Sequence, residues 1–174
     1  MKLGSLNEEM NMKQYSFANV DLIIDADYPG RPSSNPASFK IKGFSTGENL
    51  INAMRKAPIA VTTFDAFGQM IISMQRIRAG DLTFPVLMNA PENTYLQDWA
   101  NYMNQQADAD GQLITPIQAK IVDNMGADEV TMQNGVVLAM PSLSRGQTVN
   151  TITWALTFET MSFVRGSGGD SQDL

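Results

Sequence analysis

The stretch AGDLTFPVLMNAPENTYLQDWANYMN, residues 79–104, joins an apolar strand directly to an amphipathic helix. Its first part, residues 82–88, has the composition of a strand, and Pro91 follows that strand. Proline has no N–H group to donate to a β-ladder. Pro85 therefore predicts that residues 82–88 lie at the edge of a sheet or carry a bulge.

The second part of this stretch predicts a helix over about residues 93–106, with Asn93 or Thr94 as its N-cap. Apolar residues recur there at helical spacing, which is typical of a helix that buries one face. The candidate helix-packing residues are Leu96, Trp99 and Met103. We expect this stripe to pack on the core rather than to bind a ligand.

Alternation of polar and apolar residues predicts strands before and after this stretch. We expect strands over 15–28, 39–44 and 115–123, and two strands joined by a turn at Gly68 within 61–77. A turn at 78–81 would then return the chain, so that 82–88 pairs with the preceding strand. Asn134-Gly135 predicts a hairpin turn within 127–141.

The clearest strand is VNTITWALTFETMSF, residues 149–163. Its apolar residues occupy even positions up to Phe158 and odd positions from Met161 onward. A one-residue shift moves side chains to the opposite face of a sheet. The shift predicts a bulge, or a crossing between sheets, near Glu159-Thr160.

Together these patterns predict a mainly β (α+β) fold with two packed antiparallel sheets, forming a small sandwich or barrel with one flanking helix. Residues 28–60 are expected to form a long loop excursion that contains only the short strand 39–44. We expect a flexible N-terminal arm over 1–14, a single β domain over 15–165 and a flexible tail over 166–174.

The composition argues against most catalytic and metal-binding functions. The 174 residues include no cysteine and no histidine, so thiolate ligands, a cysteine nucleophile and the usual general base are all lacking. The segment DADGQ (108–112) lacks the later ligands of a calcium loop, and GFSTGEN (43–49) lacks a phosphate-loop signature. We therefore predict no enzyme activity and no cofactor or metal.

The charge is −6 overall, with a pI near 4.5, which is opposite to the footprint of a phosphate-binding protein. Residues 31–78 contain seven basic and two acidic residues, whereas residues 81–129 contain eight acidic residues and one basic residue. Such segregation can steer identical copies toward head-to-tail contact. Solvated faces on separate loops would explain it equally well. No apolar run is long enough for membrane anchoring, and no secretory signal is evident, so synthesis in the cytoplasm is expected.

The order YSFANVDLII, IKGFSTGENL, TTFDAFGQMIISMQRIRAGDLTFPVLMNAPENTYL and TWALTFETMSF resembles the tail tube proteins of tailed bacteriophages. The resemblance covers most of residues 15–163, and GDLTFPVL followed by APENTYL is its most distinctive part. It implies a virion subunit, six copies of which close into a ring with a continuous inner β-barrel. Stacked rings would form a tube through which DNA passes without specific binding, with tail sheath and baseplate proteins as partners. The segment PGRPSSNPAS (29–38), within the expected excursion, departs from shorter family members.

Self-assembly through sheet edges and the excursion identifies a set of candidate interface residues. They are Phe39, Ile41, Phe44, Leu50, Ile51, Met54, Arg55, Lys56, Thr83 and Pro85. Two other functions remain open: a baseplate or tube-terminus ring protein of the same fold, and a monomeric β-sandwich module that binds a small ligand or carbohydrate.

Overall fold

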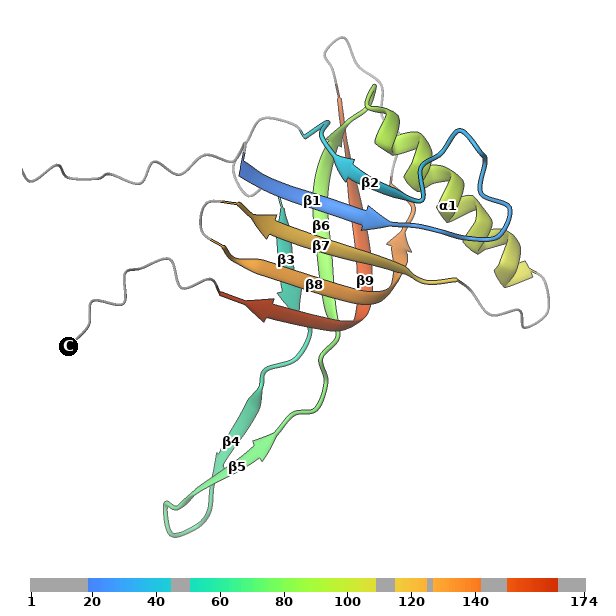
Figure 1. Cartoon of the computed structure of the whole chain (residues 1–174). Coiled ribbons are helices and arrows are strands. Elements are labelled where there is room, and N and C mark those ends of the chain that lie inside the picture. The colour runs from blue at the N-terminus through green and yellow to red at the C-terminus, as the bar shows by residue number, and fades with distance from the viewer. Residues whose placement is uncertain (1–18, 45–50, 109–114, 125–126, 142–149, 166–174) are drawn as a thin grey trace, which may run out of the picture.

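The computed structural model describes residues 19–44, 51–108, 115–124, 127–141 and 150–165 (Figure 1). Within these ranges the chain forms strands and a single helix, α1 (Pro91–Asp108). The strands are β1 (Val20–Asp25), β2 (Ser38–Ile41), β3 (Asn52–Arg55), β4 (Ala60–Phe64), β5 (Met70–Met74), β6 (Gly80–Leu87), β7 (Ile117–Asp123), β8 (Glu129–Ala139) and β9 (Thr151–Val164).

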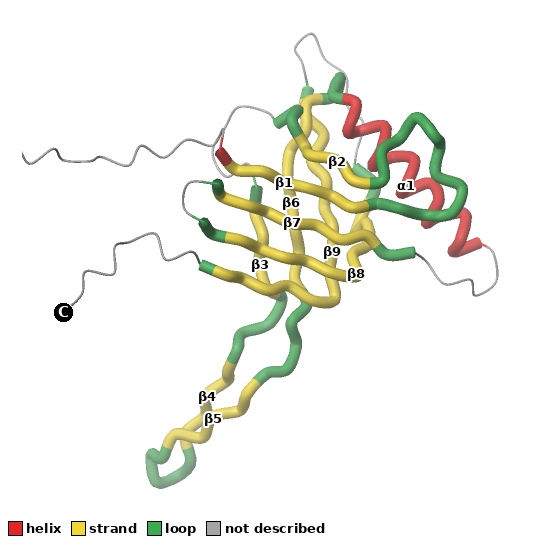
Figure 2. Tube along the Cα trace, in the orientation of Figure 1, coloured by secondary structure: helices red, strands yellow, loops and turns green. Residues whose placement is uncertain are grey.

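Two antiparallel sheets of very different size contain these strands, which confirms the predicted mainly β class. The larger sheet has the order β2-β1-β7-β8-β9-β6-β3, and the smaller one is the hairpin β4-β5. β8 and β9 bend sharply, so the larger sheet folds over on itself (Figures 1 and 2). One layer contains β2, β1 and β7, and the other contains β6 and β3. We call this folded sheet together with α1 the body.

A bulge in β8 marks the place where the larger sheet bends. Ile117 of β7 pairs with Gly135, but Ala119 pairs with Met132, so β8 carries one extra residue at this point. Asn134 accommodates it with a φ of 56°, a left-handed conformation that asparagine tolerates better than most residues. The predicted hairpin turn at Asn134-Gly135 is therefore wrong, because the same backbone preference serves a bulge within one continuous strand.

A second bulge lies beside the first, in β9. Gly80 of β6 pairs with Phe158, yet the Arg78 carbonyl accepts a hydrogen bond of 2.8 Å from the Met161 N–H. One extra residue of β9 therefore lies at the predicted position, Glu159-Thr160. The Asn134 amide donates a 2.6 Å hydrogen bond to the Glu159 carboxylate, so the two bulges are tied together at the bend.

The core lies between the two layers and under α1. Alternating residues of β1, β6 and β9 point into it, and Leu96 and Trp99 of the helix are fully buried against them. The largest fully buried side chains of the strands are Trp154, Phe84, Phe158, Leu22, Ile24, Ile41, Leu82, Ile117, Met132 and Leu156. Met103 is partly buried and packs against this cluster.

β6 lies between β9 and β3, so its predicted place at a sheet edge is wrong, as is its predicted pairing with the preceding strand β5. The pairing with β3 ends where Thr83 lies opposite Asn52. Alternate N–H groups of a strand point the same way, and the Leu87 N–H points away from β9 toward the Gly43 carbonyl, 2.7 Å away. The nitrogen of Pro85 faces that same side, beyond the end of β3. Its missing donor therefore leaves the β6–β9 ladder intact.

The start of α1 also differs from the predicted N-cap. The helix begins at Pro91, a position that suits proline because the first helical N–H has no partner within the helix. The Asn93 side chain instead links three elements: its amide donates to the Leu87 carbonyl at 2.6 Å, and its oxygen accepts from the Trp154 indole at 2.9 Å. The Glu92 carboxylate accepts from the Lys42 backbone N–H at 3.0 Å.

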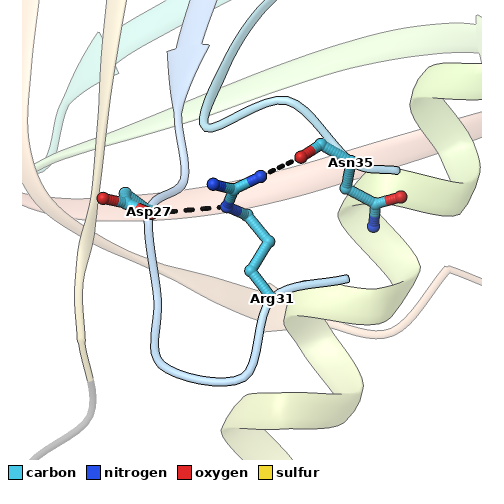
Figure 3. Close-up of polar contacts among 3 residues, drawn as sticks. All are labelled: Asp27, Arg31 and Asn35. Carbon is cyan, nitrogen blue, oxygen red and sulfur yellow. Dashed lines mark hydrogen bonds and ion pairs between the residues drawn. The ribbon is translucent and has the colours of Figure 1, made fainter. Parts of the chain in front are cut away.

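The expected excursion over 28–60 is more ordered than predicted, because it contains β3 as well as β2. Its first part folds back on α1. There Arg31 contacts the Asp27 carboxylate at 3.3 Å and donates to the Asn35 carbonyl (Figure 3). The Asn35 amide donates to the Asp98 carboxylate of α1 at 2.8 Å. Burial raises the pKa of the Tyr28 hydroxyl in this loop, and the negative charge of Asp98 adds to the rise.

Candidate assembly surface

The segment that leaves the body is residues 57–78, which we call the arm. It contains β4 and β5, and it extends away from the body as a narrow ribbon (Figure 1). At its base the Lys56 N–H donates to the Ala79 carbonyl at 3.0 Å. Further from the body, the Gln75 N–H donates to the Ile59 carbonyl at 2.8 Å. These two hydrogen bonds link the outgoing and returning segments of the arm between the body and the β4–β5 ladder.

Large apolar side chains of the arm are exposed along its whole length. The exposed large hydrophobic residues between 57 and 78 are Ile59, Val61, Phe64, Phe67, Met70, Ile71, Ile72, Met74 and Ile77. No side chain of β4 or β5 belongs to the buried core. Contiguous exposed apolar surface of this kind is typical of a protein–protein interface, and an isolated two-stranded hairpin is only marginally stable in water.

The two faces of the arm are unequal. Strand pairing places Thr62 opposite Ile72 and Phe64 opposite Met70, and Ala60 lies opposite Met74 on the same face. The other face presents Val61 opposite Ser73 and Thr63 opposite Ile71. The first set, which we call the apolar face, therefore carries four large hydrophobic side chains, Phe64, Met70, Ile72 and Met74, and the other face carries two.

Hydrogen bonds hold the tip of the arm in one conformation. The Asp65 carboxylate accepts from the backbone N–H groups of Phe67 and Gln69, each at 2.8 Å, and the Asp65 N–H donates to the Gln69 carbonyl at 2.9 Å. Gly68 has a φ of 78°, which confirms the predicted turn. This turn leaves the Phe67 side chain 91% exposed.

A groove of about 430 Å³ lies at the base of the arm. Its apolar wall includes Ile59, Met74 and Ile77, and its basic wall includes Arg55 and Arg78. The remaining lining residues are Gln75, Thr160, Met161 and Ser162. The groove thus combines exposed hydrocarbon with two guanidinium groups.

Arg55 is held at this groove by the end of β9. One of its guanidinium nitrogens donates to the Met161 carbonyl at 3.2 Å, and the guanidinium carbon lies 5.7 Å from the centroid of the Phe163 ring. Lys56 beside it pairs with Asp81 at 3.1 Å. Arg55 Nε is buried and has no hydrogen-bond partner within the ranges that the structure describes.

The structure separates the predicted interface residues that it describes into four groups. Phe39 and Ile41 point into the chain's own core, and Thr83 and Pro85 lie on the inner strand β6. Phe44 and Ile51 are partly buried against the core. Met54, Arg55 and Lys56 lie at the exposed edge formed by β3 and the arm base, and Leu50 lies outside the described residues.

The body also turns a polar sheet face outward, opposite its core. On this face Lys40 of β2 pairs with Asp21 of β1, and Lys120 of β7 pairs with Glu129 of β8 at 3.1 Å. The hydrogen bond from Lys40 lowers the pKa of Asp21, and the hydrogen bond from Lys120 lowers the pKa of Glu129. Both carboxylates therefore stay charged, and both lysines are paired, at neutral pH.

The described part of the chain brings together no group of three or more acidic side chains that would hold a metal ion. Its helix is not apolar enough over its length to span a membrane.

Chains from tube and sheath assemblies share this fold. The chain is similar to one from the sheath/tube terminator of an extracellular contractile injection system, PVC, in the extended state, with a TM-score of 0.55, 12% identity, and coverage of 87% of this chain and 96% of that one. A chain from the PVC sheath–tube complex has a TM-score of 0.54, 11% identity, and coverage of 94% and 100%. A chain from the anti-feeding prophage cap, a tube terminating cap, has a TM-score of 0.51 at 11% identity, with coverage of 94% and 100%.

No family model matches the sequence, and no curated protein sequence matches it. The similarity is therefore one of fold.

The exposed residues of the arm were not among the predicted interface residues. The signal was present in the sequence, because Asp65 is the only charged residue between Lys56 and Arg76. A stretch of this length with a single charged residue is unusual for a solvated hairpin. The scarcity of charge would therefore have placed residues 57–75 at an interface.

Proposed function

We propose that this chain is a structural subunit of the tail tube of a phage or a phage-tail-like particle. Identical copies associate into rings, six to a ring, and the rings stack around a lumen through which DNA passes without specific binding. The subunit has no enzyme activity and no membrane anchor. It is made in the host cytoplasm and ends in the virion, where tail sheath and baseplate proteins are its further partners.

The observation that carries this proposal is the exposed apolar arm. Burying a large hydrophobic side chain contributes about 1.5–3 kcal/mol, and the apolar face of the arm holds four such side chains that the subunit itself leaves in water. The exposed edge at β3 offers Met54, Arg55 and Lys56 as a second contact, with Phe44 and Ile51 beside it. When one surface of a copy contacts a different surface of the next copy, the copies form a closed ring or an open filament, depending on the rotation that relates neighbouring copies.

The polar outer face of the body suits the wall of a DNA-conducting lumen. Affinity for DNA rises with each phosphate that a lysine or arginine neutralises. The lysines of β2 and β7 are each paired with a carboxylate on this face. Such a wall is hydrated but binds phosphate weakly, and DNA would slide along it.

The main alternative is a ring protein at the tube terminus or in the baseplate. The similarity to a tube terminator and a tube terminating cap supports it, because the fold alone does not distinguish one ring from many. A monomeric β-sandwich that binds a small ligand is the other alternative, and the exposed arm argues against it.

Negative-stain microscopy of the purified full chain over a range of concentrations tests the proposal. A tube subunit forms long hollow fibres of uniform width, whereas a terminus protein stops at single rings. Particles that remain monomeric at the highest concentration would contradict both functions and favour the binding module.

A further inference from the structure

We infer that the tip of the arm of one copy docks in the groove at the arm base of a second copy. This inference rests on the proposed self-assembly and specifies one of its contacts. The tip supplies Phe67 and Asp65, and the groove supplies an apolar wall and two arginines.

The chemistry of the two surfaces is complementary. Phe67 is the most exposed of the large hydrophobic side chains in the described ranges, and the groove offers Ile59 and Ile77 as hydrocarbon partners. Asp65 is the only carboxylate of the arm, while Arg55 and Arg78 lie in the groove wall. A carboxylate and a guanidinium form charge-assisted hydrogen bonds when they meet.

The geometry of each partner is fixed before they meet. Two hydrogen bonds to the Asp65 carboxylate and two to its backbone hold the tip turn, and the end of β9 holds Arg55. Preorganised surfaces lose less conformational entropy on binding.

The tip of the arm lies far from the arm base (Figure 1), where the residues that line the groove are found. The tip therefore cannot dock in the groove of its own chain, and we assign the groove to the tip of a second copy. The tip of one copy then occupies the groove of the next, and the tip of that copy remains free. A contact of this heterologous kind repeats along a ring or a filament.

Disulfide crosslinking tests the contact against a clean background, because the chain has no cysteine. Ala66→Cys places a thiol beside Phe67 without removing the aromatic ring, and Ile77→Cys places one in the groove. Ser33→Cys, in the exposed loop that packs on α1, is the matched control. The single variants are mixed in pairs, allowed to assemble, oxidised and separated on a non-reducing gel.

We expect a covalent dimer from the mixture of Ala66→Cys and Ile77→Cys, and no product above background from Ala66→Cys with Ser33→Cys. A variant that carries both Ala66→Cys and Ile77→Cys should give a ladder of covalent oligomers on the gel. A disulfide requires Cα atoms within about 7 Å, so the dimer reports direct docking. If rings or fibres are visible in the microscope but Ala66→Cys joins Ile77→Cys no better than Ser33→Cys, this contact is wrong while the proposed function stands. If nothing assembles, both are wrong.

Charge-neutral variants add a second readout. Asp65→Asn keeps an oxygen that accepts from Phe67 and Gln69 but removes the negative charge, and Arg78→Gln removes a positive charge from the groove. Each should raise the protein concentration needed for half-maximal crosslinking by about three- to tenfold. The variant that combines Asp65→Asn with Arg78→Gln should need a concentration little higher than either single variant, because the two changes remove the same interaction. Fully additive effects would overturn the pairing of these two groups.

Discussion

The body and the arm place similar apolar side chains on antiparallel strands, but the body buries them and the arm exposes them. In the body, Leu82 and Phe84 of β6 have no exposed surface. In the arm, Ile71 and Ile72 of β5 are 53% and 54% exposed. The body stabilises a single chain, whereas the arm has apolar surface that only another molecule can cover. Folding and assembly are therefore assigned to different parts of the chain, and mutations should separate them.

Removing a large aromatic side chain from the body should have the largest effect on stability. Trp154→Ala creates a cavity in the core and leaves the Asn93 oxygen without its indole donor, so we expect a loss of about 3–5 kcal/mol. Urea denaturation followed by circular dichroism measures it.

The matched control is Phe67→Ala, which removes an aromatic ring from the arm tip. It should change the stability of the monomer by less than about 0.5 kcal/mol. Equal losses in the two variants would contradict the separation of body and arm.

The two faces of the arm offer a more sensitive comparison. Ile72→Thr and Ile71→Thr make the same change at adjacent, equally exposed positions on opposite faces. If the apolar face docks, Ile72→Thr should weaken self-association by about 2 kcal/mol, or roughly 30-fold in the dissociation constant. Ile71→Thr should have a smaller effect, and neither should alter unfolding of the monomer. Sedimentation over a concentration series provides the dissociation constants, and equal weakening would show that the faces do not differ in function.

Within the body, the polar link between α1 and the sheet should contribute a smaller amount. Asn93→Ala removes the hydrogen bonds to Leu87 and Trp154 and leaves a buried indole N–H unpaired, which should cost about 1–2 kcal/mol. Asn101→Ala, at an exposed position on the same helix, should be nearly neutral. A neutral result for both would mean that Asn93 does not hold the helix in place.

The smallest effect concerns pH. The ion pairs with lysine lower the pKa values of Asp21 and Glu129 in the folded chain. A carboxylate with a depressed folded pKa contributes stability above its unfolded pKa, and that contribution is lost as the pH falls through the folded pKa. We expect a shallow loss of stability below about pH 4. Lys40→Met should reduce the slope in a denaturation series from pH 6 to 2, and an unchanged slope would show that the Asp21 pair contributes nothing.

Much of the fold could be predicted from local pattern. The alternation around Leu22 and Ile24, the turn at Gly68 and the parity shift near Glu159 are all local signals, and the structure confirms each of them. The partner of β6 could not be predicted, because strand pairing depends on contacts between residues distant in sequence. Asn134-Gly135 was misread because a left-handed residue suits a bulge as well as a hairpin turn.

The candidate site was harder to predict than the fold. Alternating apolar residues look the same in a strand whether the covering surface belongs to the same chain or to another one. Residues 61–77 therefore predicted a hairpin, but the pattern did not show that the hairpin leaves the body. Phe39 and Ile41 were assigned to the interface because they lie in the expected excursion over 28–60, and the structure places them in the core.

Sedimentation velocity of the full chain, compared with a variant in which residues 60–74 are replaced by a short Gly-Ser turn, tests the central claim most directly. The account predicts that the full chain forms rings or fibres, while the shortened chain stays a monomer with the same urea midpoint. A shortened chain that assembles as well as the full chain, or a full chain that sediments as a monomer at high concentration, would contradict it.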